Sequence, residues 1–134
     1  MTITYSYAPD VERLAEDIVV RLRMRHVRLD RFACVRSMGS RASRTVARLH
    51  SIPKIWEKAL GIEPCYAIEV ISERYDQLDE EEKEKTIIHE LLHIPRSFRG
   101  GFRHHRNYVT GLRVRKLHDL LTERRRAAVN VKAP

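Results

Sequence analysis

The sequence predicts an α+β fold, in which a short, mainly antiparallel or mixed sheet is combined with an N-terminal helix, a histidine-bearing helix and a C-terminal helix. Three observations support this prediction. Apolar residues recur at helical spacing over residues 9–24, 79–94 and 110–127. Residues 66–72 alternate in the way a half-buried strand does. The 134 residues contain neither repeats nor linker-like stretches, so residues 1–134 are expected to form one domain.

The N-terminal part should contain one helix and two extended segments. Residues 9–24 carry apolar side chains at i, i+3 and i+4 spacing, and Pro9 suits the first turn of such a helix. Residues 32–36 and 45–50 are predicted as strands, with residues 37–43 as the loop between them.

The middle of the chain should contain a short helix followed by a strand. Residues 53–60 fit a helix that is closed by Gly61, with Trp56 as a core anchor beneath it. The segment 66–72 is apolar enough to lie at the centre of the sheet, whereas residues 45–49 are the better candidate for an edge strand.

The helix over residues 79–94 has signals at both ends. Asp79 is the expected N-cap, with a glutamate three residues later as its capping-box partner. The ring of Pro95 would clash with the carbonyl four residues earlier, so the helix should end just after His93. The last helix should begin with Thr110 as its N-cap.

This helix carries the motif His89-Glu90-Leu91-Leu92-His93, an H-E-x-x-H pattern. Two histidines four residues apart project from one helical face and can reach one metal ion. Glu90 stands between them and can take a proton from a metal-activated water. Burying two imidazoles and a carboxylate among apolar residues is costly unless something satisfies them. The motif therefore predicts a zinc ion held by His89 and His93, with Glu90 as the catalytic base.

A third protein ligand is expected downstream, since a catalytic zinc usually has three protein ligands and one position for water. Gly100 and Gly101 permit a sharp turn, by which the chain can fold back and present His104 or His105. Glu123 is the only downstream glutamate, but its arginine neighbours suit a solvated helix end better. The residues alone leave His104 and His105 as alternatives.

Two segments around the motif resemble a known family. Residues 85–95, KTIIHELLHIP, and residues 100–105, GGFRHH, are similar to the metallopeptidases of archaea and phages that are related to the SprT-like zincins. The stretches 37–40 and 68–74 are similar to that family as well, so the resemblance covers residues 32–118.

The resemblance implies a small zincin-like domain that hydrolyses peptide bonds with a zinc-activated water. It also implies His89 and His93 as metal ligands and Glu90 as general base. The later histidine of the family stands just before a basic residue, and this favours His105 as the third ligand, with His104 as the second choice.

Two supporting roles have several candidates each. A tetrahedral oxyanion needs a further hydrogen-bond donor. The candidates, which are close in sequence to the third ligand, are Arg103, His104 and Tyr108. Carboxylates that could orient the ligand imidazoles are sought upstream of the motif, and the candidates are Glu69, Glu73 and Asp76.

The net formal charge is +8, with arginine clusters near both ends of the chain. Such density can neutralise phosphates without reading a base sequence, so non-specific nucleic acid is a candidate partner beside a peptide or protein substrate. A plain solvated basic surface is the alternative. SprT-like relatives include proteases that act on DNA-bound proteins, and the resemblance therefore favours the nucleic-acid option.

The remaining composition indicates a cytoplasmic protein without membrane association. No apolar run approaches the length of a membrane span, and the N-terminus lacks the pattern of a secretory signal. Cys34 and Cys65 are isolated and lack C-x-x-C spacing, which favours reduced thiols, although a disulfide between them is the alternative.

Two functions from different classes fit these observations. The first is a zinc-dependent metallopeptidase, and the second is a non-catalytic, metal-stabilised domain that binds nucleic acid or protein. Glu90 favours the first, because a structural metal site needs no additional carboxylate beside the metal. A closed site that used both His104 and His105 would favour the second.

Overall fold

The computed structural model describes residues 2–103 and 108–132. Along the chain, its strands and helices are β1 (Thr4–Tyr7), α1 (Pro9–Arg21), the 3₁₀ turn η1 (Leu29–Arg31), β2 (Phe32–Met38), β3 (Ala47–Ser51), α2 (Lys54–Leu60), β4 (Tyr66–Ile71), α3 (Ser72–Tyr75), α4 (Glu80–Leu92) and α5 (Gly111–Lys132). This order of helices and strands confirms the predicted α+β class.

The strands form one four-stranded sheet in the order β1-β2-β4-β3. β2 and β4 are parallel, whereas β1 pairs with β2 and β3 pairs with β4 in antiparallel fashion. The sheet is therefore mixed, as predicted. β4 is central and β3 lies at an edge, and both placements confirm the predictions made from their apolar content.

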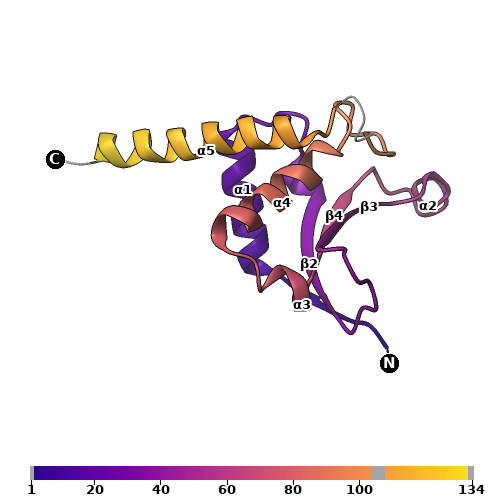
Figure 1. The fold of residues 1–134 in the computed structure, drawn as a ribbon. Coiled ribbons are helices and arrows are strands. Elements are labelled where there is room, and N and C mark those ends of the chain that lie inside the picture. Colours follow the sequence, from indigo (N-terminus) through magenta and orange to yellow (C-terminus); the bar gives the residue numbers. More distant parts are fainter. Residues whose placement is uncertain (1, 104–107, 133–134) are drawn as a thin grey trace.

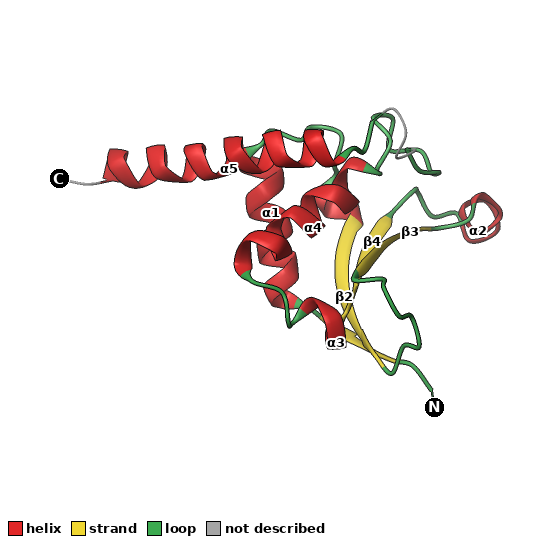
Figure 2. Ribbon diagram, viewed as in Figure 1, coloured by secondary structure: helices red, strands yellow, loops and turns green. Residues whose placement is uncertain are grey.

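Helices α1 and α4 lie on the same side of the sheet, and the core fills the space between these two layers (Figure 2). Ile18 of α1, Ile68 of β4 and Leu91 of α4 are fully buried there. Burial of each such side chain contributes about 1.5–3 kcal/mol. α5 packs against α1 and α4, and its C-terminal part extends away from the rest of the fold (Figure 1).

Both ends of α4 follow from local chemistry. The Asp79 side chain accepts a hydrogen bond of 2.8 Å from the backbone N–H of Glu82, which confirms the predicted N-cap. The helix ends at Leu92 with His93 as its C-cap, just before Pro95. Gly61 likewise closes α2 in the left-handed conformation, and Thr110 caps α5 through the N–H of Arg113.

The structure differs from the predicted local structure in several places. Strand β1 and helix α3 were not anticipated, and Trp56 is 52% exposed rather than a core anchor. Helix α1 ends at Arg21 instead of residue 24, because Arg23 adopts a left-handed φ of 53°.

None of the described helices combines the length and apolar character that crossing a membrane requires.

Candidate metal centre

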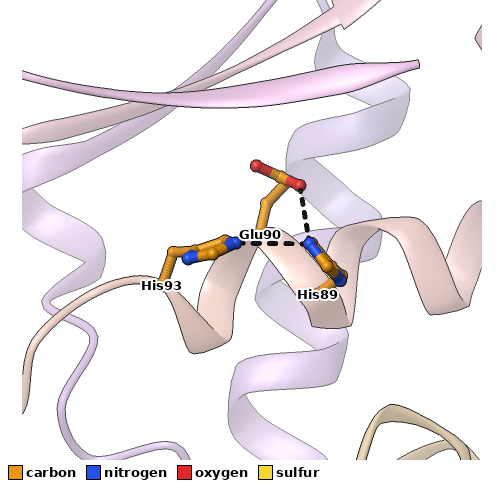
Figure 3. A group of neighbouring side chains, drawn as sticks. All are labelled: His89, Glu90 and His93. Carbon is orange, nitrogen blue, oxygen red and sulfur yellow. Dashed lines mark hydrogen bonds and ion pairs between the residues drawn. The ribbon is translucent and has the colours of Figure 1, made fainter. Parts of the chain in front are cut away.

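His89, Glu90 and His93 lie together at the C-terminal end of α4 (Figure 3). One potential ligand atom of each lies within 4.8 Å of the others. The Nε2 atoms of His89 and His93 face each other across 3.2 Å. Two ligand nitrogens at roughly 2.0 Å from one tetrahedral zinc are about 3.3 Å apart, so the observed separation fits a shared ion.

The ring of His93 is oriented by the backbone of the following loop. Its Nδ1 lies 2.6 Å from the carbonyl oxygen of Arg103, and the N–H of Arg103 donates to the His93 carbonyl at 2.8 Å. A carbonyl can only accept, so Nδ1 carries the proton when the ring is neutral, and the lone pair of Nε2 is turned toward His89. This arrangement of a ligand histidine is typical of metal sites.

The loop itself is anchored on β4. Gly100 and Gly101 have φ values of 97° and 78°, which confirms the predicted turn. The Tyr66 hydroxyl accepts from the N–H of Gly100 at 3.0 Å and donates to the carbonyl of Gly101 at 3.2 Å. The chain thus returns to His93 at residue 103. His104 and His105, the predicted third ligands, follow at once but lie outside the described residues.

Glu90 is buried beside the two histidines, with 8% of its surface exposed. Its Oε2 lies 3.8 Å from Nε2 of His89. Burial raises the pKa of Glu90 to about 7, and a hydrogen bond from the backbone N–H of Leu49 partly opposes this rise. A carboxyl group of this pKa can both accept and release a proton near neutral pH.

A cleft opens beside His89 and Glu90. It is bounded by α4, by the first turn of α5 and by residues 44–47, which lead into β3. Within the described residues no strand pairs with the outer edge of β3. An extended peptide could therefore add to this edge by backbone hydrogen bonds, close to the buried carboxylate.

A comparison with models of protein families matches residues 3–122 to the family described as "Putative phage metallopeptidase". The chain belongs to this family. Membership supports the metallopeptidase class and implies a metal, which the cluster of His89, Glu90 and His93 is suited to hold. No curated protein and no solved structure matched the chain.

In this member of the family, the three carboxylates considered as orienting groups have other partners. Glu69 accepts from Arg48 at 2.9 Å and is 2.8 Å from His50. Glu73 accepts from the N–H of Gly39, and Asp76 pairs with Arg36. The acceptor observed at His93 is a backbone carbonyl instead. Every residue has a backbone carbonyl, so the sequence does not show which carbonyl binds His93. The predicted glycine turn was the only signal that this loop would fold back.

The side chains of Tyr108, Arg103 and Glu123 have neighbours outside the cluster. Tyr108 lines a separate cavity together with Leu92 and His26, and its hydroxyl accepts a hydrogen bond from Arg113. The guanidinium of Arg103 lies against the Tyr108 ring. Glu123 of α5 lines a third cavity with His118 and Asp119. His104, the remaining oxyanion candidate, is outside the described residues.

Proposed function

We propose that the protein is a zinc-dependent peptidase in which His89 and His93 hold the metal and Glu90 is the general base. The observation that carries this proposal is the 3.2 Å separation of the two facing imidazole nitrogens, with a buried carboxylate beside them. A structural metal site would need no such carboxylate. The non-catalytic alternative is therefore the weaker one.

Each residue contributes a defined part of the proposed reaction. Zinc bound here would lower the pKa of a water molecule and polarise the scissile carbonyl. Glu90 takes the proton from the attacking water and returns it to the leaving amine. The Arg103 carbonyl keeps His93 in the orientation that binding requires. The outer edge of β3, where no described strand pairs and where the Leu49 N–H binds Glu90, aligns an extended peptide or unfolded protein along the cleft.

The third ligand is proposed to come from the residues that follow the loop. Residue 103, which directly precedes these histidines in the sequence, is bound to His93 through both its N–H and its carbonyl. We assign His105 first and His104 second, as the similarity to SprT-like zincins favours. The unpaired thiols of Cys34 and Cys65 fit the proposed cytoplasmic location.

Metal analysis combined with a cleavage assay tests this proposal. The purified protein should contain about one zinc per chain, and its cleavage of an unfolded protein should stop with a chelator and return with added zinc. His89→Ala and His93→Ala should lose the zinc. His50→Ala is the matched control, since His50 is exposed and pairs with Glu69. Full zinc content in both site variants would refute the proposal.

A further inference from the structure

A second cavity of the molecule is lined by positive charge. Its wall includes Arg23, Arg25, Arg96 and Arg113, together with His26 and Tyr108. The other described residues that line the cavity are apolar, and none of them carries a carboxylate. The four arginines come from three places in the chain: the turn after α1, the loop after α4 and the first turn of α5. The fold therefore brings together arginines that are far apart in the sequence.

These arginines differ from others in the same protein. Arg36 lies between Asp10 and Asp76, and Arg125 lies between Asp17 and Glu84. In the described part of the chain, by contrast, none of the cavity arginines forms an ion pair. Residues 104–107 read HHRN and contain no acidic side chain. The positive charge of the cavity is thus left without an internal counterion.

A fifth guanidinium adds to this charge from the side of the metal centre. Arg103 lies 3.4 Å from the centroid of the Tyr108 ring, and Arg113 lies 4.0 Å from it. Arg113 also donates to the Tyr108 hydroxyl at 3.1 Å. Nη1 of Arg103 is buried and has no hydrogen-bond partner among the described residues. Two like charges on one ring repel each other, and a bound anion would relieve the repulsion.

The pKa of His26 is also affected by these arginines. Burial lowers the pKa of His26, a hydrogen bond with the Leu91 carbonyl opposes this effect, and the charges of Arg103, Arg96 and Arg113 lower the pKa further. The neutral ring is therefore favoured, with its proton on Nε2 toward the Leu91 carbonyl, and His26 adds no positive charge to the cavity.

We propose that this cavity binds a phosphate group. Guanidinium groups match the geometry and charge of phosphate oxygens by paired hydrogen bonds. Two guanidiniums already lie against the Tyr108 ring, so we do not expect a nucleic-acid base to stack on it. Recognition rests on the phosphate alone, which either a small phosphorylated compound or a nucleic-acid backbone supplies.

Calorimetric titration with inorganic pyrophosphate and with a short oligothymidylate tests the proposal at low salt. The double variant Arg25→Gln/Arg96→Gln should weaken binding of the recognised probe at least about tenfold. The matched control is Arg13→Gln/Arg126→Gln, which removes the same charge from exposed arginines outside the cavity. Its affinity should stay within about twofold of wild type. The metal ligands remain in both variants, so probe bound at the metal would survive in both.

The two probes distinguish the source of the phosphate. Pyrophosphate binding alone assigns the cavity to small phosphorylated compounds, whereas oligothymidylate binding that pyrophosphate displaces assigns it to a nucleic-acid backbone. A second readout needs no variant: pyrophosphate should protect Arg25 and Arg96 of the wild type from phenylglyoxal, as read by mass spectrometry. Three results would overturn the proposal. They are that neither probe binds, that both double variants lose affinity equally, or that an acidic peptide binds with the same affinity as the probe.

Discussion

A single backbone carbonyl, that of Arg103, fixes which nitrogen of His93 faces His89. Such an acceptor cannot be removed by substituting its own side chain. The position of the carbonyl depends on the loop, which Tyr66 holds through Gly100 and Gly101. The loop thus holds residue 103 against His93, and the two candidate third ligands are the next two residues in the sequence.

His105→Ala should lose zinc affinity far more than His104→Ala, because only one further protein ligand is needed for an open catalytic site. Competition with a chromogenic chelator measures both affinities. The reverse order would reassign the ligand to His104. Equal, large losses would indicate a closed site in which both histidines bind, and would contradict the peptidase proposal.

At the scale of the elements, α1 ends in a motif where glycine is usual. The N–H of Arg23 donates to the carbonyl of Val20, and the N–H of Met24 donates to that of Val19 at 2.9 Å. This is a Schellman ending with arginine in the left-handed position. A side chain is unfavourable in that conformation, so a functional reason for arginine is expected there, and the proposed phosphate site provides one.

Arg23→Gly should raise the free energy of unfolding by about 1 kcal/mol, because glycine adopts a left-handed φ without steric strain. Urea denaturation measures the change. Arg25→Gly is the control, since Arg25 is not among the residues with positive φ and should gain nothing. Stabilisation by both substitutions, or by neither, would contradict the assignment of strain to Arg23.

The edge strand β3 is tied to β4 by a buried carboxylate. Glu69 is 2% exposed; burial alone would raise its pKa, but interactions with Ser37, His50 and Arg48 lower the pKa below its usual value. A lowered folded-state pKa means that the ionised Glu69 stabilises the fold above the unfolded-state pKa of about 4.3. This stabilisation is lost as the pH falls through the folded-state pKa.

Glu69→Gln should therefore lower the free energy of unfolding by about 1–3 kcal/mol at pH 7, where the charged partner of Arg48 is lost. The difference from wild type should shrink below about pH 4, as Glu69 becomes neutral in the wild type too. Denaturant curves across this range measure both quantities. A difference that does not depend on pH would show that the Glu69 charge does not contribute.

Features that depend on neighbouring residues could be predicted from the sequence, whereas features that depend on distant contacts could not. Both ends of α4 were predicted, because Asp79 and Pro95 act on their own neighbours. The end of α1 was missed, since no glycine marks it. Strand β1 was missed although its threonine and tyrosines favour β structure, because all its residues are exposed and form no apolar pattern. Glu69 was predicted only as a candidate for orienting a ligand imidazole. Its burial and its pairing with Arg48 and His50 of β3 were not predicted, because they depend on residues that are distant in the sequence.

For the whole molecule, the net charge of +8 is distributed unevenly. Part of this charge is neutralised by internal ion pairs. Arg125 of α5, for example, pairs with Asp17 of α1 and Glu84 of α4. The unpaired arginines around the second cavity form a local excess instead. This distribution favours an anionic partner over an evenly solvated basic surface.

Binding to nucleic acid, which we propose as a property of the basic surface, should be tolerant of sequence and sensitive to salt. Filter binding with unrelated oligonucleotides should show similar retention at about 50 mM salt and a steep loss by about 200 mM. No retention at the lower concentration would exclude nucleic acid as a partner. Strong preference for one sequence would contradict recognition through phosphates alone.

The central claim is that Glu90 moves a proton in peptide hydrolysis. Glu90→Gln keeps the shape of the side chain but removes the base, while His89 and His93 remain to hold the zinc. The most direct test compares the zinc-loaded wild type and the zinc-loaded variant on one unfolded protein that the wild type cleaves. We predict that the variant retains fold and zinc and loses about 10²–10⁴-fold in rate. A zinc-loaded variant that cleaves as fast as the wild type would contradict the account.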